Sequence, residues 1–428
     1  MDLISPCVPS MRLIAPQPTP LAGVHEVKPA HVITYTPDHG PVGRAYWRLT
    51  SEPHDHTPAE TAERVRELLH DAVAAQLPAS GPCGAMLSGG VDSTSVAALA
   101  ARLLPRALDT YCVEFDSDKT HFAPTELRPD VDAPYAAAAA DFMATRHTTL
   151  TASMRDLLGV ISATRRARDL PGWGQFDASM YLLFQRMRQD TTAALSGEAA
   201  DEFFGGYPYL FNTELTRRDT FPWLGDGPKL ADYLVPELAQ DGDEKARYAQ
   251  LLGEVPRLPG EEEQDARMRE VLYLGMAGPL AVVLDRKERM SAAQGLHVRL
   301  PFCDHRLVQY VWNVPWSMKC AGGLKSLLKD AMADILPPAT MTRQKSAYPH
   351  VQDPAHDQAL VRVAKWTANA SESPLRAMFD TPRLNLLLDR IGANELRARL
   401  PGGASGAQLL VQLVELNAWV RDYRVALP

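Results

Sequence analysis

A short glycine turn between a strand and a helix is the feature that most constrains the fold of this chain. In AMLSGGVDSTSVAALAARLL, residues 85–104, an apolar segment ends at Leu87, two glycines follow, and an alanine-rich helix runs through Leu104. A second apolar strand, LDTYCVEFD, comes next. Strand, turn, helix and strand in this order form a βαβ unit, and such units build parallel sheets. We therefore expect an α/β fold in which helices flank a parallel sheet.

The glycine turn has the composition of an anion-binding loop. Gly89 and Gly90 let the backbone turn tightly, and the amides that open the following helix favour an anion. Ser88 and Ser93 can donate to phosphate oxygens, whereas Asp92 would repel a phosphate unless a divalent cation lay between them, so Mg²⁺ is part of the hypothesis. The chain has no GxxxxGK[ST] loop, and this turn is not a GxGxxG fingerprint.

Other segments give a coarse secondary structure. HVITYTPDHGPVGRAYWRL, residues 31–49, predicts a hairpin, and a capping box at Thr57 and Glu60 opens a helix expected over 57–77. A strand, TAALS, leads into a second acidic turn. From about residue 226 strand signals vanish and helical patterns dominate, as in DEKARYAQLLGEV, KSLLKDAMADIL and GAQLLVQLVELNAWVRDYRV. We expect a mostly helical C-terminal half.

Composition excludes several classes of protein. The net charge of −8 argues against a nucleic-acid-binding surface, and no run of about 18 apolar residues or signal peptide suggests a membrane protein. We therefore expect a cytoplasmic protein without nucleic-acid or membrane partners. The five cysteines form no CxxC pair, so we expect reduced thiols rather than disulfides or a zinc site.

SGGVDS resembles the pyrophosphate-binding loop of the PP-loop ATP pyrophosphatases, and LSGEAADEFFGGY, residues 195–207, resembles the second signature of asparagine synthetase B and its relatives. The resemblance implies ATP as the nucleotide and release of pyrophosphate. It also implies that Asp201 joins Asp92 in holding Mg²⁺, and that Glu198 takes a proton from the attacking nitrogen.

A third segment, LDRKERMSAAQGLHVRLPFCD, resembles the long helical signature of the same family. His297 stands where the family usually has glutamate, and we interpret it as a packing or hydrogen-bonding residue, although the exchange could alter substrate recognition. The matching positions are Arg289, Met290, Ser291, Gly295, Arg299, Pro301, Phe302 and Asp304.

Two lysines complete the resemblance. Lys325 stands at a helix start and Lys345 in an RQK turn. In the family these positions supply one lysine to the pyrophosphate and one to the reacting acyl-adenylate. Fixed cations suit this chemistry because adenylation and amide formation both build up negative charge in the transition state.

The nucleoside and acyl sites leave weaker traces. By resemblance, adenosine lies across the carboxyl ends of the strands, which also fits the general rule for open α/β sheets. The residues expected at the nucleoside are Leu87, Val113 and Gly197. The candidates for the acyl substrate pocket, for which core packing is an equal alternative, are Trp173, Asp177 and Tyr181.

The segments predict four parts: an irregular leader over 1–20, a remnant β segment of a glutaminase domain over 21–50, the PP-loop α/β region over 51–225, and a helical part over 226–428. The family's glutaminase domain uses a cysteine exposed after removal of the initiator methionine. Here residue 2 is Asp2, and Cys7 follows Pro6 in the leader. We therefore expect no glutamine hydrolysis, and a nitrogen supply from free ammonia, a separate glutaminase or carrier partner, or an amine.

The leading hypothesis is an ATP-dependent amide-forming ligase that adenylates a small carboxylate and transfers it to ammonia or an amine. Relatives that close β-lactam rings typically carry tyrosine at the position of Glu198, so the glutamate favours external nitrogen over an intramolecular cyclase. A PP-loop tRNA-modifying enzyme and an inactive ATP-binding partner subunit are the remaining alternatives. A homodimer is left open.

Overall fold

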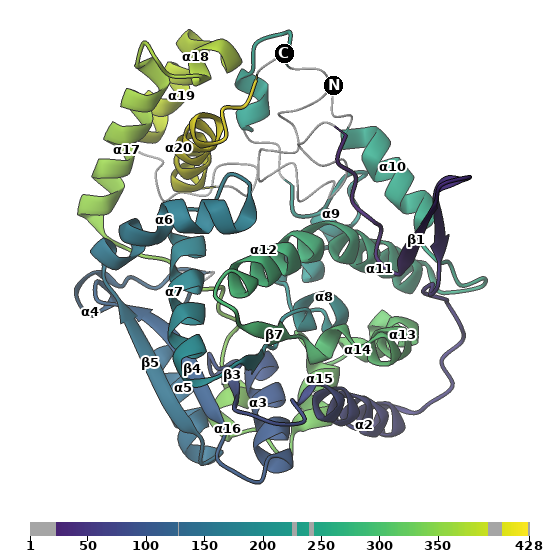
Figure 1. The fold of residues 1–428 in the computed structure, drawn as a ribbon. Coiled ribbons are helices and arrows are strands. Elements are labelled where there is room, and N and C mark those ends of the chain that lie inside the picture. The colour runs from purple at the N-terminus through teal and green to yellow at the C-terminus, as the bar shows by residue number, and fades with distance from the viewer. Residues whose placement is uncertain (1–22, 127, 225–228, 239–243, 393–404, 427–428) are drawn as a thin grey trace.

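Five parallel strands form the sheet that positions the rest of the chain (Figure 1). The spatial order is β5-β4-β3-β6-β7, and the inner strands are almost fully buried, as expected when helices cover both faces. The strands are β3 (Cys83–Met86), β4 (Asp109–Phe115), β5 (Arg146–Ala152), β6 (Ala193–Leu195) and β7 (His297–Arg299). The expected α/β class is confirmed.

The order of the strands reverses direction between β3 and β6. From β3 the chain moves outward to β4 and β5, then returns to the other side of β3 with β6 and β7. In open parallel sheets, ligands bind in the crevice at the carboxyl ends of the strands where this reversal occurs. The two turns singled out in the sequence, at residues 88–93 and 196–201, follow these two strands.

We describe a computed structural model in which residues 23–426 are placed, except 127, 225–228, 239–243 and 393–404. The expected leader over 1–20, with Cys7, lies outside the described residues. The predicted hairpin is present as β1 (His31–Thr36) and β2 (Gly40–Ala45), an antiparallel pair that stands apart from the main sheet (Figure 1).

The helices of the first half agree with the sequence pattern where the pattern was strong. The capping box at Thr57 and Glu60 is formed and opens a helix close to the expected range of 57–77. The helices are α2 (Pro58–Gln76), α3 (Val91–Leu103), α4 (Asp118–His121), α5 (Ala133–Phe142), α6 (Met154–Arg168), α7 (Gln175–Asp190) and α8 (Ala200–Phe204).

The second half is mostly helical, as expected. Its α-helices are α9 (Thr213–Thr216), α10 (Glu244–Glu254), α11 (Glu263–Gly275), α12 (Ala281–Ala292), α13 (His305–Asn313), α14 (Trp316–Lys319), α15 (Ser326–Met332), α16 (Pro338–Thr342), α17 (Pro354–Asn369), α18 (Leu375–Met378), α19 (Thr381–Arg390) and α20 (Gly406–Asp422). Short 3₁₀ turns are η2 (Pro208–Phe211), η3 (Leu230–Tyr233) and η5 (Pro301–Cys303).

A π-helical turn, η4 (Met276–Leu280), joins α11 to α12. Pro279 lies inside this turn and has no N–H to donate to the helical ladder, which explains the local departure from α geometry. The turn sets the path of α12, the helix whose side chains reach the end of β6.

Two strands correct or extend the sequence interpretation. The expectation that strand signals end near residue 226 was wrong, because β7 pairs with β6 in the main sheet. Three residues inside a long helical signature are too short to show a period of two. The edge strand β5 was not predicted, because RHTTLTA is mostly polar; in the structure its residues are exposed or partly buried except for Ala152, as suits an edge position.

The helices α17, α19 and α20 form a group of their own at the C-terminal end (Figure 1). They share an apolar cluster that includes Leu387, Leu413 and Trp419. A buried ion pair attaches them to the sheet region, because Arg165 on α6 donates to Glu415 on α20 at 2.8 Å.

Candidate active site

The loop after β3 is built to receive an anion. Gly90 is the N-cap of α3 and no side chain caps the helix, so the first amides of α3 remain available to a ligand. Gly89 has a φ of +78°, and a Cβ there would lie 2.5 Å from the backbone of Tyr135, so only glycine fits. The hydroxyl of Ser88 lies 3.1 Å from that of Ser93, which places both beside the open amides.

The loop after β6 touches the first loop directly. A Cβ on Gly197 would lie 2.5 Å from the backbone nitrogen of Ser93, so glycine is required where the two backbones meet. Gly206 is equally constrained, since a Cβ there would lie 1.9 Å from Oδ1 of Asp201 and 2.1 Å from Cε of Lys325. Gly197 and Gly206 of the segment LSGEAADEFFGGY therefore allow neighbouring backbone and side-chain atoms to approach closely.

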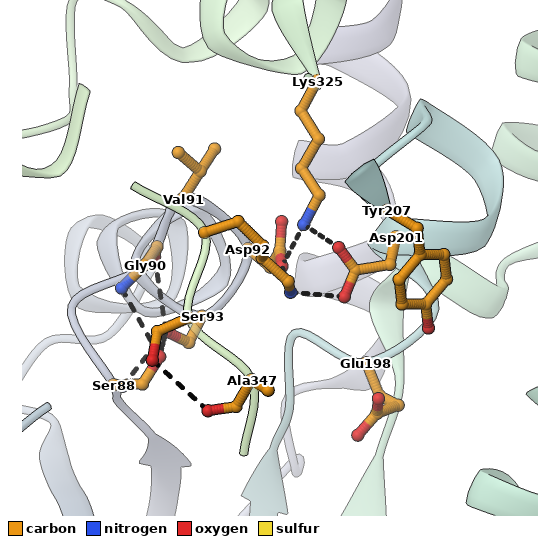
Figure 2. Close-up of polar contacts among 12 residues, drawn as sticks. Ser88, Gly90, Val91, Asp92, Ser93, Glu198, Asp201, Tyr207, Lys325 and Ala347 are labelled. Carbon is orange, nitrogen blue, oxygen red and sulfur yellow. Dashed lines mark hydrogen bonds and ion pairs between the residues drawn. The ribbon is translucent and has the colours of Figure 1, made fainter. Parts of the chain in front are cut away.

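Lys325, Asp92 and Asp201, which are distant in sequence, converge between these loops (Figure 2), and Lys345 joins them. The Nζ atom of Lys325 lies 2.5 Å from Oδ2 of Asp92 and 2.5 Å from Oδ1 of Asp201. The Nζ atom of Lys345 lies 2.5 Å from Oδ2 of Asp201 and 3.8 Å from Oδ2 of Asp92. The structure thus brings together four of the predicted site residues.

The electrostatics of this cluster favour the charged forms of Asp201 and Lys345. Burial would raise the pKa of Asp201, but Lys325 and Lys345 outweigh it and hold the pKa below its usual value. Burial would lower the pKa of Lys345, yet Asp201 and Asp92 raise it well above the usual value for lysine. Lys325 has a left-handed backbone, with a φ of +55° at the N-cap of α15, and such strain in a non-glycine residue often marks a functional position.

The two aspartates fit a magnesium ion that is shared with a phosphate ligand. Oδ1 of Asp92 is buried and accepts no hydrogen bond within the described part of the chain. Among the described residues, no three His, Cys, Asp or Glu side chains gather as they would around a metal held by protein alone. Mg²⁺ in nucleotide sites commonly takes one or two carboxylates and completes its shell with phosphates and water.

Glu198 stands apart from the lysine–aspartate cluster (Figure 2) and is paired with a residue that sequence reasoning missed. Lys287 on α12 places its Nζ atom 2.7 Å from Oε2 of Glu198 and donates to Oγ of Ser196 at 2.7 Å. Burial would raise the pKa of Glu198, but Lys287 outweighs it and lowers the pKa. The available signal was spacing, since Lys287 precedes buried Met290 and Ser291 by three and four residues on one helix face.

Arg343 is a second site residue that was not predicted from the sequence. It holds the segment that contains Lys345 against the loop after β3. Its guanidinium donates to the carbonyl of Ser88 at 2.5 Å and to Asp132 at 2.5 Å, and lies 4.2 Å from the ring centre of Tyr135. Thr340 adds a hydrogen bond to the carbonyl of Gly89 at 3.2 Å. These contacts, across sequence separations of 255 and 251 residues, hold the segment against the loop.

Comparison with known proteins identifies the family. A family model described as asparagine synthase matches residues 64–421. This chain belongs to the asparagine synthase family. The expected class, an ATP-dependent carbon–nitrogen ligase, is confirmed by this membership.

Individual relatives of the asparagine synthase family cover most of the chain. Asparagine synthetase [glutamine-hydrolyzing] 3 of Bacillus subtilis is 32% identical over 412 residues, which cover 94% of this chain and 67% of the relative. Asparagine synthetase [glutamine-hydrolyzing] 1 of the same organism is 23% identical, over 78% of this chain and 57% of the relative. The chain therefore spans 67% and 57% of the lengths of these two relatives.

Among solved structures, an NH3-dependent NAD synthetase from Campylobacter jejuni matches 49% of this chain and 100% of that chain, with 14% identity and a TM-score of 0.24. At this TM-score the likeness does not bear on function. None of the described helices is both long enough and apolar enough to span a bilayer.

The candidates for the acyl pocket lie on or near α7, and one of them is deeply buried. Asp177 is fully buried, and its carboxylate accepts from Arg286 at 2.5 Å, from Arg168 at 3.1 Å and from the backbone of Trp173 at 2.8 Å. Burial would raise the pKa of Asp177, but the two arginines lower it. Tyr181 packs against the apolar cluster that contains Met290 and Phe184. Substrate contacts of these residues stay a prediction.

Two of the residues expected to contact the nucleoside lie in or directly after strands of the parallel sheet. Leu87 is buried directly after β3, and Val113 is buried inside β4, two residues before its end; contact of either residue with adenosine stays a prediction. His297 lies elsewhere, because it is exposed at the start of β7 and pairs with Ala193 at the start of β6. Since the site lies at the opposite ends of the parallel strands, the histidine is not positioned to contact a substrate there.

The four cysteines in the described part of the chain are free thiols. Cys83, Cys112 and Cys320 are buried and Cys303 is partly buried. Burial raises the pKa of Cys112 to about 11, so this thiol is protonated at neutral pH and a poor nucleophile.

Proposed function

We propose that this chain adenylates a small-molecule carboxylate with ATP, releases pyrophosphate, and transfers the acyl group to ammonia or an amine. The observation that carries the proposal is the convergence of Lys325 and Lys345 on Asp92 and Asp201 between the two loops. Charged groups gathered from four distant segments suit the transfer of a highly charged phosphate.

In the first step, a carboxylate oxygen forms a bond to the α-phosphorus of ATP while the bond to pyrophosphate breaks. The amides of α3 and the hydroxyls of Ser88 and Ser93 would hold the pyrophosphate, and Lys325 would neutralise its growing charge. Mg²⁺, held by Asp92 and Asp201, would supply charge neutralisation at the phosphates when bound.

In the second step, nitrogen forms a bond to the acyl carbon and the bond to AMP breaks. Lys345 is the more exposed of the two lysines, with 30% of its side chain accessible against 6% for Lys325, and it would stabilise the oxyanion of the tetrahedral intermediate. Glu198, 27% exposed, would accept the proton that nitrogen loses.

The proposal leaves the acid and the nitrogen donor to experiment. Asparagine formation from aspartate and a specialised amidation both use these steps. We infer that ammonia or an amine serves as donor, with a separate glutaminase as one source of ammonia. The presence of glutamate rather than tyrosine at position 198 supports an external nitrogen over ring closure.

The deciding experiment is carboxylate-dependent exchange of radiolabelled pyrophosphate into ATP across a panel of acids that includes aspartate. Product masses are then measured with ammonia and with glutamine as donors. We expect exchange with at least one acid and an amide product with ammonia. A protein that bound ATP but showed no exchange with any acid would be an inactive partner subunit, and equal rates with glutamine alone would contradict the proposed nitrogen source.

A further inference from the structure

The Lys287 ammonium contacts two side chains of the loop that follows β6, and one of them is Glu198. Ser196 and Glu198 flank Gly197, the glycine that presses against the first loop, and the Lys287 ammonium contacts both of their side chains at 2.7 Å. The ammonium also lies 3.9 Å from the sulfur of Met86. Lys287 is only 3% exposed, so its ammonium is held in one place rather than moving in solvent.

Lys287 contacts one of the two carboxylate oxygens of Glu198. Lys287 approaches Glu198 at Oε2, on one edge of the carboxylate, which leaves Oε1 as the oxygen for a second partner. The Glu198 side chain is 27% exposed, so part of it is open to a ligand. A carboxylate anchored through one oxygen keeps a fixed direction for the other, which is what proton acceptance from a bound nucleophile requires.

We propose that Lys287 is the positioning residue of the amide-forming step, because it anchors Glu198 through Oε2 and presents Oε1 to the incoming nitrogen. This inference rests on the proposed function. In the step, nitrogen bonds to the acyl carbon, the carbon–oxygen bond to AMP breaks, and the proton lost by nitrogen passes to Oε1 of Glu198. Lys287 itself exchanges no atom with the substrate.

The charges around Glu198 give the inference a distinctive signature. Lys287 faces it from α12, Asp201 and Glu202 from α8, Cys303 from η5, and Lys345 from the segment after α16. Burial and Asp201 raise the pKa of Glu198, whereas Lys287 and, less strongly, Lys345 lower it. Without the Lys287 ammonium the pKa of Glu198 rises, and a larger fraction of the carboxylate is protonated at low pH and unable to act as a base.

The kinetic test compares Lys287→Met with Lys287→Arg, which keeps the charge, and with Lys365→Met, which removes a lysine from an exposed ion pair on α17. Pyrophosphate exchange and amide formation are measured separately across pH with the acid identified in the panel. In Lys287→Met we expect amide formation to fall about 10- to 100-fold more than exchange, and its acidic limb to move to higher pH. Lys287→Arg should return the limb toward its original position, and Lys365→Met should match wild type.

A second measurement does not depend on turnover. Protein labelled with ¹³C at the glutamate carboxyl carbon is titrated by NMR, and Glu198→Gln identifies the signal of Glu198. We expect the midpoint to be higher in Lys287→Met than in wild type, with thermal melting used to verify that each variant is folded. An unchanged midpoint together with an equal loss of both half-reactions would overturn the role of Lys287. Absence of exchange by the wild type would instead contradict the proposed function, while the titration would still decide whether Lys287 controls Glu198.

Discussion

The ammonium of Lys325 lies 2.5 Å from the carboxylate of Asp92, although the two residues are 233 positions apart in the sequence. This contact joins the start of α15 to the loop that opens α3. Since Asp201 shares the same ammonium, Lys325 fixes the distance between the two carboxylates expected to hold Mg²⁺. A buried lysine thus lies at the centre of the charged cluster between the two loops.

Replacement of Lys325 by methionine should abolish most of the first half-reaction. The departing pyrophosphate would lose a fixed cation, so we expect pyrophosphate exchange to fall about 10²- to 10³-fold. Lys329→Met, one turn further along α15, is the matched control and should exchange at close to the wild-type rate. A near-normal rate in Lys325→Met would show that this lysine does not contact the pyrophosphate.

Gly206→Ala should inactivate the protein without unfolding it. The added Cβ would meet Oδ1 of Asp201 and Cε of Lys325 at 1.9 Å and 2.1 Å, so both side chains must leave their positions. The control is Gly253→Ala in α10, where nothing lies within 4 Å and the helix should gain about 0.5–1 kcal/mol. The two variants are compared by pyrophosphate exchange and by thermal melting. Full activity in Gly206→Ala would mean that the pair can be held in another arrangement.

Asp177→Asn separates a packing role from a substrate role for a predicted pocket residue. Two buried arginines would lose their carboxylate partner, so we expect the free energy of unfolding to fall by about 3–5 kcal/mol in urea titrations. The comparison variant is Asp389→Asn, which removes the carboxylate from the exposed ion pair with Lys365. It should lower the free energy of unfolding by less than about 1 kcal/mol. Wild-type stability with a raised KM for the acid would instead assign Asp177 to the substrate.

Because Lys319 is buried, we expect an unusual pH dependence of the free energy of unfolding. The side chain is 2% exposed, and burial lowers its pKa to about 8. Below pH 8 the lysine is charged in both the folded and the unfolded state, so burial of its charge costs stability. Between about pH 8 and its ordinary value of 10.5 the folded state releases the proton first, and this cost is relieved as pH rises.

Lys319→Met should therefore be more stable than wild type at pH 7, and the difference should shrink toward pH 10. Urea titrations at both pH values measure it, with Lys365→Met as the control for loss of a lysine side chain. A difference that grows with pH would contradict the assignment of the charge cost to Lys319.

Local sequence was sufficient for the elements with strong patterns. The helix from Pro58 to Gln76 follows from its capping box, and the α/β class follows from the strand, turn and helix around Gly89 and Gly90. The site residues on the two loops were also predicted, because glycines, serines and carboxylates directly after apolar strands are a local signal. The strand β7 was missed, since three residues carry no readable period.

What tertiary structure alone decided is how distant charges are paired. The sequence names Lys325, Lys345, Asp92 and Asp201 as separate candidates, and only the folded chain brings the lysine ammonium groups within 2.5–3.8 Å of the aspartate carboxylates. Lys287 had no local signal beyond its place on a buried helix face, because burial of a charge depends on a partner supplied by another element, here Glu198 after β6. The sequence by itself determined the kind of loop and the kind of sheet, which depend on neighbouring residues. The folded chain determined which charges face each other, because Coulomb interactions depend on distance in space and not on separation along the chain.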